Sequence, residues 1–273
     1  MSRAVPQPVP PGEAPDLGDD AAAPPPDLPG SKALERELDG LRERLAELGA
    51  ALCAEKERAL LVVLQSRDTG GKDGVVDKVF GAVLPQHLRV QAFQQPSDEE
   101  RAHDFLWRVH AAVPPYGTVG VFNRSHYEEV VTARVHGLVP EEVWGRRYRQ
   151  INDFERMLAE NGVRLVKLFL HVSRAEQMRR LQKRLEKPTK RWEFDPSDLR
   201  DRERWDEFTE AYRDAIARCG TEWAPWHVIP ADDKAVRNLL VARIVVDALE
   251  HLDPQYPDPD YDVEESLKRL ERL

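Results

Sequence analysis

Cysteine is scarce in this sequence of 273 residues, in which only Cys53 and Cys219 occur. Two cysteines are too few for a disulfide framework or a cysteine-based zinc site. Long apolar runs are also lacking, since no stretch approaches the roughly 20 residues that a membrane helix needs. The N-terminus lacks the pattern of a signal peptide. These absences argue against a disulfide-rich secreted protein and a membrane protein, and we expect a protein of the reducing cytoplasm.

The net charge of −9 is unevenly distributed along the chain. Residues 1–30 and residues 252–273 each carry a net charge of −4, so the body between them is close to −1. Within the body lies a dense basic cluster, opposed in that stretch by Glu186 alone. Because the local field decides what binds, a polyanionic ligand is compatible with this acidic chain. The cluster comprises Arg179, Arg180, Lys183, Arg184, Lys187, Lys190 and Arg191.

The composition divides the chain into four segments. Residues 1–30 are rich in Pro, Ala and Asp, which is typical of a disordered or extended tail. Residues 31–59 are predicted to form a helix with a leucine stripe, which packs either on the body or on a partner subunit of a homodimer or homotetramer. Residues 60–251 are predicted to form the main domain, and residues 252–273 an acidic C-terminal tail with a short helix near 263–272.

Strand and helix patterns alternate through the main domain. Such alternation predicts an α/β fold: a parallel five-stranded sheet between two helical layers, a three-layer sandwich. Ligands of such sheets bind at the carboxyl ends of the strands. The expected strands are 60–65, 88–94, 118–122, 164–172 and 226–229. The expected helices are 72–83, about 97–113, from about 125, 140–161, 174–186, 202–219 and 234–250.

A glycine-rich loop follows the first of these strands. Gly70, Gly71, Lys72 and Gly74 stand between the apolar run 60–65 and an amphipathic helical pattern. In a phosphate-binding loop (P-loop), backbone N–H groups and a lysine hold phosphate oxygens at a helix N-terminus. We therefore predict that this loop binds phosphate.

Two positions of the loop depart from the usual P-loop pattern. Ser66 stands where Gly is usual, and Asp73 replaces the Ser or Thr whose hydroxyl normally holds Mg²⁺. The metal then needs another ligand, and we expect Asp68, inside the loop, to supply it.

Asn123 and Arg124 directly follow the predicted strand at 118–122. An acid is usual at the first position. Because Asn123 is a weaker metal ligand than an acid, we expect Asp68 to supply more of the metal coordination. Arg124 is expected to clamp a phosphate through its bidentate guanidinium, with a surface ion pair as the alternative. Glu128 begins a helical stretch, where a capping role competes with ligand binding. Arg108, on the helix at 97–113, is a further candidate for a nucleotide phosphate.

The basic cluster is predicted to belong to a helical lid at about 179–205. Arg180, Lys183, Arg184 and Lys187 share a helix face, and Lys190 and Arg191 continue it. A lid of this kind closes on phosphates and excludes water; a solubilising face is the alternative. The cations outnumber the needs of one nucleoside triphosphate, which favours a polyphosphate ligand.

These motifs together resemble the nucleotide-kinase-like second family of polyphosphate kinases, over about residues 60–251. The loop of that family, Asp-x-x-Gly-Lys-x-Gly, matches residues 68–74, and its strand end, Phe-Asn/Asp-Arg-Ser-x-Tyr, matches residues 122–127. The triplets 72–74 and 127–129 resemble class III, which acts on nucleoside mono- and diphosphates. Ser66-Arg67 and Glu193 depart from that class. Further matches are residues 104–108, 134–136, Asp198-Leu199, Arg202, Trp205, 224–232 and Lys234.

The resemblance implies a P-loop kinase-like fold and a reversible transfer of the terminal phosphoryl group of polyphosphate to AMP or ADP. It implies Mg²⁺ as cofactor, with Mn²⁺ as a substitute, and ATP, GMP or GDP as further nucleotides. Neither nucleic acid nor a membrane is expected as a partner. Asp68, Lys72 and Arg124 would be catalytic. Phosphates would be held by Gly70, Gly71, Gly74, Lys78, Arg180, Arg184, Lys187, Lys190 and Arg191. The nucleotide would be held by Arg108, Asn123, Tyr127, Glu128 and Arg134.

Two rival hypotheses remain at this point. An ATP-dependent nucleoside monophosphate kinase of thymidylate-kinase type shares the loop and a similar strand end, but it does not need so many lid cations. A non-catalytic P-loop protein that binds nucleotide, and a partner through the leucine stripe, fits the missing loop hydroxyl and Asn123.

Overall fold

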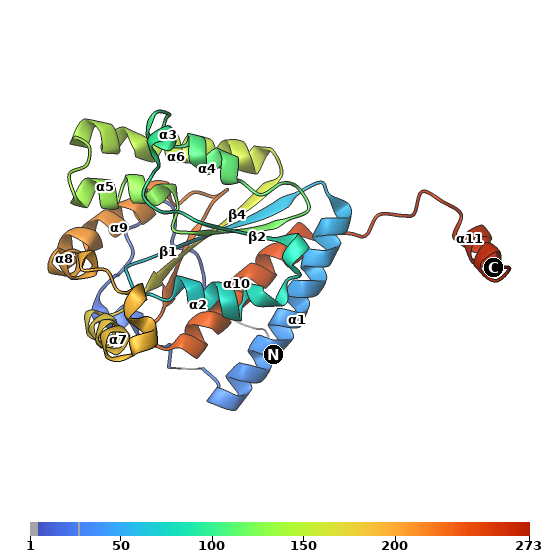
Figure 1. Cartoon of the computed structure of the whole chain (residues 1–273), viewed down its shortest axis with the longest axis horizontal. Coiled ribbons are helices and arrows are strands. Elements are labelled where there is room, and N and C mark those ends of the chain that lie inside the picture. The colour runs from blue at the N-terminus through green and yellow to red at the C-terminus, as the bar shows by residue number, and fades with distance from the viewer. Residues whose placement is uncertain (1–4, 27) are drawn as a thin grey trace.

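The computed structural model describes residues 5–26 and 28–273. These residues form a domain around a five-stranded sheet (Figure 1). The strand order is β2-β3-β1-β4-β5, and every neighbouring pair is parallel. The predicted α/β fold with a five-stranded parallel sheet is confirmed. The strands are β1 (Ala59–Ser66), β2 (Leu88–Ala92), β3 (Val119–Asn123), β4 (Val163–His171) and β5 (Trp226–Pro230).

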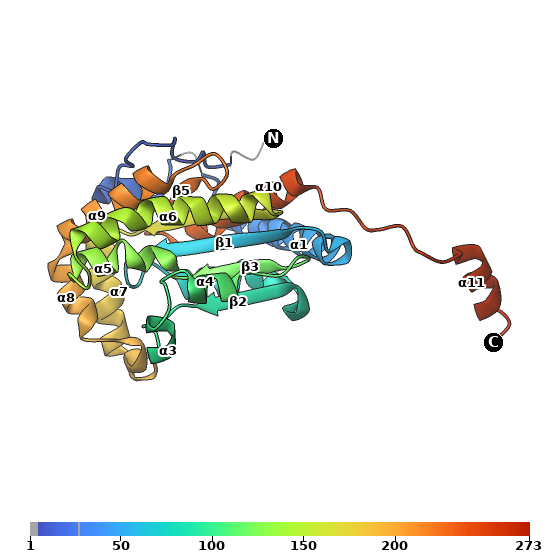
Figure 2. The same cartoon turned by 90° about the horizontal axis from the view of Figure 1, so that it is seen from above.

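Helices cover both faces of the sheet, as Figure 2 shows from above. Leu60, Val62 and Leu64 of β1 face one hydrophobic core, and Leu61 and Val63 face the other. This alternation explains why a strand buried on both sides is a continuous apolar run. The first face carries α1 (Ser31–Glu55), α2 (Lys72–Lys78) and α10 (Lys234–Leu252); the second carries α4 (Trp107–Ala112), α5 (Thr132–Val135), α6 (Glu141–Glu160) and α9 (Trp205–Cys219).

The remaining helices lie at the rim of the sheet or beyond it. The lid consists of α7 (Arg174–Glu186), a 3-10 turn (Pro188–Glu193) and α8 (Ser197–Glu203). Ser173 caps α7 because its hydroxyl accepts a hydrogen bond of 3.2 Å from Glu176 N. Outside the lid lie α3 (Asp98–Arg101), α11 (Val263–Leu270) and 3-10 turns at Asp19–Ala22, Phe80–Ala82, Pro85–His87 and His126–Glu129.

Two predicted helices are shorter in the structure. The pattern at 72–83 gives α2 and a separate 3-10 turn, and the stretch at 97–113 is divided into α3 and α4. In the second case the carboxylate of Asp104 accepts a hydrogen bond of 2.9 Å from Leu106 N, which stabilises a turn between the helices. Amphipathic spacing alone does not reveal such interruptions.

The leucine stripe of α1 lies against α10. Leu34, Leu41, Leu45, Leu48 and Leu52 are all buried in the first core. Two ion pairs join the helices: Arg243 Nε lies 2.9 Å from Glu37 Oε1, and Arg44 Nε lies 3.0 Å from Glu250 Oε1. Of the two interpretations of the stripe, packing on the body is the one that the structure supports.

The N-terminal segment is extended but not loosely attached. Val9 N donates to Trp226 O at 2.8 Å, and Leu17 is buried in the second core. Gly18 O lies 2.8 Å from His171 Nε2, and Asp19 Oδ1 accepts a hydrogen bond of 2.9 Å from Arg174 N, at the start of the lid. Few apolar residues suffice here, because backbone groups make most of the contacts. The prediction of a disordered or loosely attached tail is corrected in this respect for residues 5–22.

The C-terminal segment leaves the body after α10. Residues 253–262 form an extended arm, and α11 stands apart from the sheet in both views (Figures 1 and 2). Among the described residues, no helix is both long and apolar enough to span a bilayer.

The contribution of the leucine stripe can be measured with Leu45→Ala. Leu45 is fully buried between α1 and the body, so the substitution leaves a cavity and should lower the free energy of unfolding by about 2–5 kcal/mol. Urea denaturation at several protein concentrations provides the measurement. The loss should not depend on concentration; a concentration-dependent loss would indicate that the stripe is a subunit contact.

Candidate active site

The glycine-rich loop leaves the carboxyl end of β1 and enters α2 at Lys72. Thr69 and Gly71 have φ angles of 63° and 97°, the left-handed conformation that lets backbone N–H groups face a common point. A Cβ at Gly70 would lie 2.5 Å from Ser66 Cβ, so this position has no room for a side chain. The amide of Gly70 donates to Arg67 O at 3.1 Å, so Gly70 shapes the loop and does not offer its N–H to a ligand.

Lys72 lies in the loop with its ammonium group turned toward β1. Its Nζ donates to Ser66 Oγ at 2.9 Å and is 3.4 Å from Ser66 O. Ser66, which replaces the usual glycine, therefore holds the lysine in this structure. Burial lowers the pKa of Lys72, and the nearby charge of Arg124 lowers it further. An anion beside Nζ would favour the charged form.

The two departures from the usual P-loop pattern contact one another. Asn123 Nδ2, at the end of β3, donates to Asp73 Oδ1, on the first turn of α2, at 2.6 Å. In common P-loop enzymes a hydroxyl occupies the helix position and an acid the strand position. Here the carboxylate (Asp73) stands on the helix and the neutral residue (Asn123) stands on the strand. The polar contact between helix and strand is kept.

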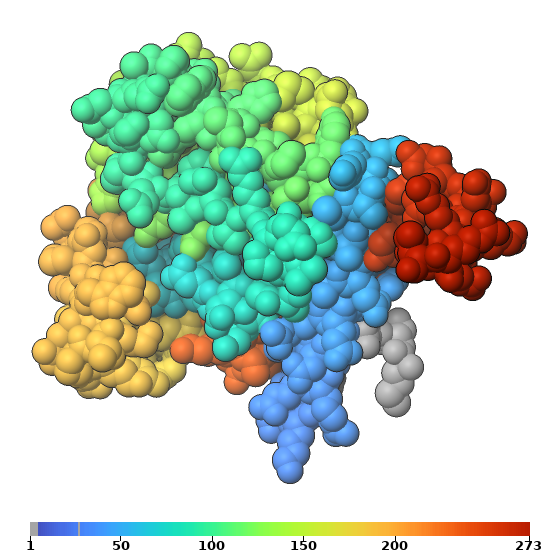
Figure 3. Space-filling model, turned by 45° about the vertical axis from the view of Figure 1, so that its right-hand side comes forward, coloured from blue at the N-terminus to red at the C-terminus, as the bar shows by residue number. Residues whose placement is uncertain are grey.

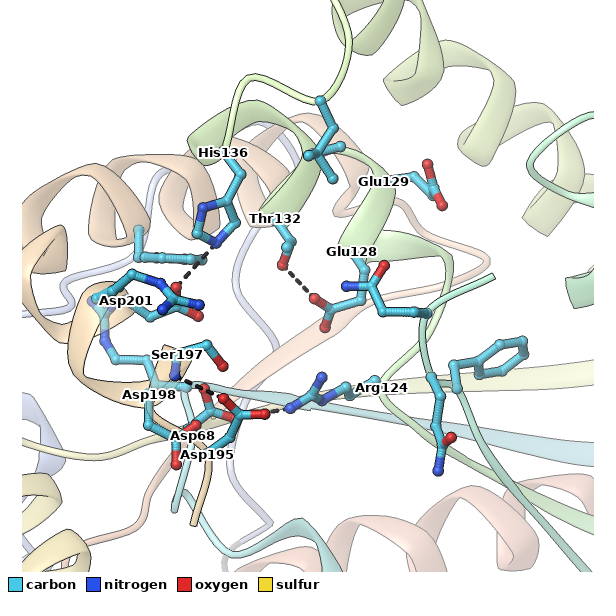
Figure 4. Close-up of a pocket in the computed structure, with 18 of the residues that line it drawn as sticks. Asp68, Arg124, Glu128, Glu129, Thr132, His136, Asp195, Ser197, Asp198 and Asp201 are labelled. Carbon is cyan, nitrogen blue, oxygen red and sulfur yellow. Dashed lines mark hydrogen bonds and ion pairs between the residues drawn. The ribbon is translucent and has the colours of Figure 1, made fainter. Parts of the chain in front are cut away.

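Asp68 and Arg124 face each other across the mouth of the loop. Arg124 Nη2 lies 2.9 Å from Asp68 Oδ1 (Figure 4). Arg124 has a φ of 61°, a conformation that is unusual for a residue other than glycine and often found at functional sites. The structure thus brings together Asp68, Lys72 and Arg124, which the sequence nominated as catalytic.

Beside the loop lies a cavity of about 680 Å³, a size typical of small-molecule sites. In Figure 3 a recess separates the gold lid from the green elements above it. Both aromatic side chains and acids of the lid line the cavity. Its lining includes Arg67, Asp68, Phe93, Gln94, Gln95, Pro96, Arg108, Arg124, Glu128, Thr132, His136, Asp195, Asp198, Asp201, Trp205 and Phe208.

Arg108 and Glu128 occupy the part of the cavity away from the lid. Arg108 Nη1 donates to Gln94 O at 2.8 Å, and the guanidinium is 5.5 Å from the ring centre of Phe93. Glu128 accepts a hydrogen bond from the hydroxyl of Thr132. Both side chains border the cavity, as expected for contacts with a nucleotide.

Acids of the lid lie close to Asp68 (Figure 4). Figure 4 shows Asp195, Asp198 and Asp68 grouped on one side of the cavity. Burial, together with the negative charge of Asp68, raises the pKa of Asp198 to about 6. Asp198 Oδ2 is buried without a hydrogen-bond partner and lies 3.7 Å from Arg184 Nη1. Asp201 makes a second lid contact, 3.0 Å from His136 Nε2.

This arrangement fits a divalent metal ion that is held by few protein ligands. Within the described residues, no group of three or more His, Cys, Asp or Glu could enclose a metal. Mg²⁺ is commonly bound through one or two carboxylates together with water and substrate phosphates. Asp68, and Asp198 with an oxygen that accepts no hydrogen bond, are carboxylates of this site that match that requirement.

The lid cations have more acidic neighbours than the local sequence indicated. Arg179 and Arg180 both pair with Glu176, at 2.6 and 2.7 Å. Arg184 and Lys190 both approach Glu193, at 3.6 and 3.3 Å. Glu186 is the only acid within residues 179–191, but Glu176 and Glu193, on either side of that stretch, also oppose the cluster. Arg191 donates to Leu185 O at 2.8 Å, and Lys187 is exposed at the end of α7.

Three nominated nucleotide or phosphate ligands lie elsewhere. Tyr127 is buried in the second core, where its hydroxyl contacts Glu155 at 2.9 Å and Lys167 Nζ at 2.8 Å. Arg134 turns toward Asp214, at 2.6 Å. Lys78 is exposed beyond the loop and lies 3.0 Å from Asp77. A motif gives the position of a residue in the chain but not the direction of its side chain, which packing decides.

Arg180 also differs from the expectation of a free lid cation. It is 7% exposed, and its guanidinium donates to the backbone carbonyls of Thr69, Gly70, Ala231 and Asp232, at 2.6 to 3.4 Å. Every nitrogen of this group is engaged, since Nε contacts Glu176. In this structure Arg180 stabilises the phosphate loop through hydrogen bonds to its backbone carbonyls.

Sequence reasoning missed several residues of the cavity. Arg67 is buried, lies 3.9 Å from the ring centre of Trp205, and has a pKa lowered to about 10 by burial. Its place directly after β1, next to Asp68, was the available signal. Asp198 and Trp205 were named only as family matches, without a role, and Asp201 was not named. All three line the cavity from the lid and the start of α9, which their local sequence does not indicate.

Comparison with known proteins gives consistent results. A sequence model described as Polyphosphate kinase 2 (PPK2) matches residues 30–257. An AMP/ADP-polyphosphate phosphotransferase of Meiothermus ruber is 50% identical over 85% of this chain and 86% of its own length. An ADP-polyphosphate phosphotransferase of Rhodopseudomonas palustris is 40% identical over 79% of each chain. The crystal structure of polyphosphate kinase 2 from Arthrobacter aurescens TC1 superposes with a TM-score of 0.88, at 42% identity, over 91% of this chain and 89% of that one.

The burial of Asp198, together with the negative charge of Asp68, predicts a pH-dependent stability. The pKa of Asp198 is about 6 in the folded protein against an ordinary value of 3.8. The folded state thus binds this proton more tightly, and its stabilising effect is lost as pH rises from about 4 to about 6. Urea unfolding without divalent metal should therefore show Asp198→Asn gaining stability relative to the unsubstituted protein across this range.

Asp195→Asn is the matched control on the same lid. Hydrogen bonding from Ser197 lowers the pKa of Asp195, so the stability that this carboxylate contributes is present above pH 4 and lost as pH falls. Between pH 4 and 6 the difference in stability between Asp195→Asn and the unsubstituted protein should therefore stay constant, whereas that for Asp198→Asn should grow with pH. A constant difference between Asp198→Asn and the unsubstituted protein would contradict the raised pKa of Asp198.

Proposed function

Because the chain belongs to the polyphosphate kinase 2 family, we propose that it transfers the terminal phosphoryl group of inorganic polyphosphate to AMP and ADP. The observation that carries this proposal is the 50% identity to an AMP/ADP-polyphosphate phosphotransferase over most of both chains. A cavity beside the phosphate loop, lined by Asp68, Arg124 and residues of the lid, supports it. In the reverse direction the enzyme would extend polyphosphate from ATP.

The phosphate loop would hold the phosphoryl group that is transferred. In this proposal Lys72 and the N–H groups of Gly71 and Gly74 bind its oxygens, and Arg124 bridges donor and acceptor phosphates. Arg184, Lys187, Lys190 and Arg191 would hold the distal part of the polyphosphate when the lid closes. Since phosphoryl transfer passes through a loose in-line transition state, such positioning and charge neutralisation account for most of the catalysis.

The reaction exchanges one phosphorus–oxygen bond for another. An oxygen of the acceptor nucleotide's last phosphate attacks the terminal phosphorus of polyphosphate, and the bond from that phosphorus to its bridging oxygen breaks. The shortened chain keeps the electron pair of that bond. Placing the two reacting groups in line within a closed cavity removes much of the entropic barrier.

A divalent ion, Mg²⁺ or Mn²⁺, would bind at Asp68 and Asp198 and neutralise phosphate charge when present. These residues would also keep the ion at the lid side of the loop. Asp73 and Asn123, which contact one another, would orient the start of α2 and not bind the ion.

The acceptor nucleotide would lie in the cavity beside the loop. Arg108 and Glu128 face this space and would contact its phosphate and sugar. Phe93, Trp205 and Phe208 offer aromatic surface for a base. Tyr127 and Arg134, which point elsewhere, would act only through the packing of neighbouring elements.

Both rival hypotheses lose support. The family match argues against an ATP-dependent kinase of thymidylate-kinase type, and the relatives are named phosphotransferases, which argues against a non-catalytic protein. Assembly into a homodimer or homotetramer stays a prediction.

The direct test is an assay without ATP. The protein is incubated with polyphosphate and Mg²⁺, and with AMP or ADP in parallel reactions. Formation of ADP and ATP from AMP, and of ATP from ADP, is expected, measured by chromatography. A protein that phosphorylates AMP only when ATP replaces polyphosphate would refute the proposal.

Asp68→Asn should abolish most of the activity at every Mg²⁺ concentration, because the variant loses a carboxylate that faces both Arg124 and the metal position. A loss of roughly 10²-fold or more in kcat is expected. Asp77→Asn, on the exposed side of α2, is the control and should keep normal turnover. Near-normal kcat for Asp68→Asn would mean that the ion is held elsewhere.

A further inference from the structure

Two buried guanidinium groups lie beneath the phosphate loop. Arg237, on α10, is 2% exposed, and Arg180, on α7, is 7% exposed. Both donate to the same carbonyl: Arg237 Nη1 lies 3.3 Å and Arg180 Nη1 3.4 Å from Gly70 O. Two helices that are distant in sequence therefore hold one peptide group of the loop.

The peptide group between Gly70 and Gly71 is trans, like the other peptide bonds of the described residues. In a trans peptide the C=O and N–H groups point in opposite directions. Because the carbonyl of Gly70 points toward the two arginines, the N–H of Gly71 points to the opposite side, where α2 begins. The arginines thereby decide which way this N–H faces.

Arg237 also fills the space under the glycines. A Cβ at Gly71 would lie 1.9 Å from Arg237 Nη1, and one at Gly74 would lie 3.0 Å from Arg237 Nη2. The close approach of loop and guanidinium thus requires glycine at position 71, where φ is also 97°. The glycine pattern, which predicted phosphate binding, also provides room for this arginine.

The charge of Arg237 lacks a close carboxylate partner in the described part of the chain. Its hydrogen-bond acceptors are Gly70 O and Asn238 Oδ1, at 2.8 to 3.3 Å, and both are neutral. Burial lowers the pKa of Arg237 to about 10, with a further contribution from Arg180. The pKa of Lys234 is lowered by burial and by the same two arginines. An anion above the loop would relieve this repulsion.

We propose that Arg237 is a positioning residue for phosphoryl transfer, which fixes the Gly70–Gly71 peptide group so that its N–H faces the transferred phosphate, and which adds positive charge beneath the loop. This inference rests on the proposed function of the loop. Arg237 does not reach the ligand itself; it acts through the peptide group, with Arg180 as its partner.

The test compares Arg237→Gln with Arg243→Gln. Arg243 lies on the same helix but contacts Glu37 of α1, so its substitution controls for a general loss of α10 stability. The probe is inorganic tripolyphosphate, titrated by calorimetry. Loss of a charge-assisted hydrogen bond should weaken tripolyphosphate binding about tenfold or more in Arg237→Gln and by less than about twofold in Arg243→Gln.

Kinetics separate positioning from a structural role. Arg237→Gln should lower kcat/KM for polyphosphate by about tenfold or more while the KM for AMP changes by less than about twofold, because Arg237 does not line the nucleotide cavity. Equal tripolyphosphate binding by Arg237→Gln and Arg243→Gln, or an equal loss of affinity for AMP and polyphosphate, would overturn the inference.

Failure of the proposed function and unfolding of the variant can both be told apart from failure of the inference about Arg237. If the unsubstituted protein forms no product from polyphosphate, the proposed function fails, but the tripolyphosphate titration still decides the role of Arg237. If circular dichroism shows Arg237→Gln to be unfolded, Arg237→Lys takes its place, since it keeps the charge but not the two-armed donor. It should bind tripolyphosphate about threefold or more weakly than the unsubstituted protein, and unchanged binding would overturn the inference.

Discussion

The parallel register of the sheet is the constraint on which the site depends. β1 pairs with β3 and β4 so that Leu64 lies opposite Asn123 and Ser66 opposite Leu170. The loop, Arg124 and the lid helix therefore all start at the carboxyl ends of neighbouring strands. A slip of β3 by one residue would turn Asn123 to the other face of the sheet. Its hydrogen bond to Asp73 would be lost, and Arg124 would no longer face Asp68. Strand pairing in the interior therefore sets distances of a few ångströms in the cavity.

Charge is layered across the site. Arg180, Arg237 and the ammonium of Lys72 lie below or within the loop, whereas Asp68, Asp198 and Asp201 lie on the lid side. A polyanion with a bound divalent ion complements both layers, since its oxygens satisfy the cations and the ion satisfies the acids. Each layer alone is unfavourable, as the lowered pKa of Arg237 and the raised pKa of Asp198 indicate. This pattern is typical of a site whose electrostatics are arranged for its ligand.

Most of the fold was predictable from the sequence, because five apolar runs alternate with amphipathic stretches and α7 spans the predicted helix at 174–186. The sequence also indicated the loop and the closeness of Asp68 and Arg124, since these two residues follow strands whose carboxyl ends lie side by side. What the sequence did not reveal depends on side-chain direction and long-range contact. Tyr127 matches a motif but packs inward on Glu155, and Arg237 meets Gly70 across 167 residues. No local pattern contains this information.

The docked N-terminal segment has a consequence for how this sheet meets other chains. Strand β5 ends the sheet on one side, where an unpaired edge is a template for strands of other molecules. Residues 6–9 lie along it, with Val9 N bonded to Trp226 O and Pro6 O facing His227. That edge is thus shielded by the chain's own backbone, which leaves β2 as the edge open to strand addition. Arg89, within β2, places a charge there, and charged edge strands resist such pairing. Loss of the first 22 residues would therefore expose a second edge and make the protein more prone to aggregate.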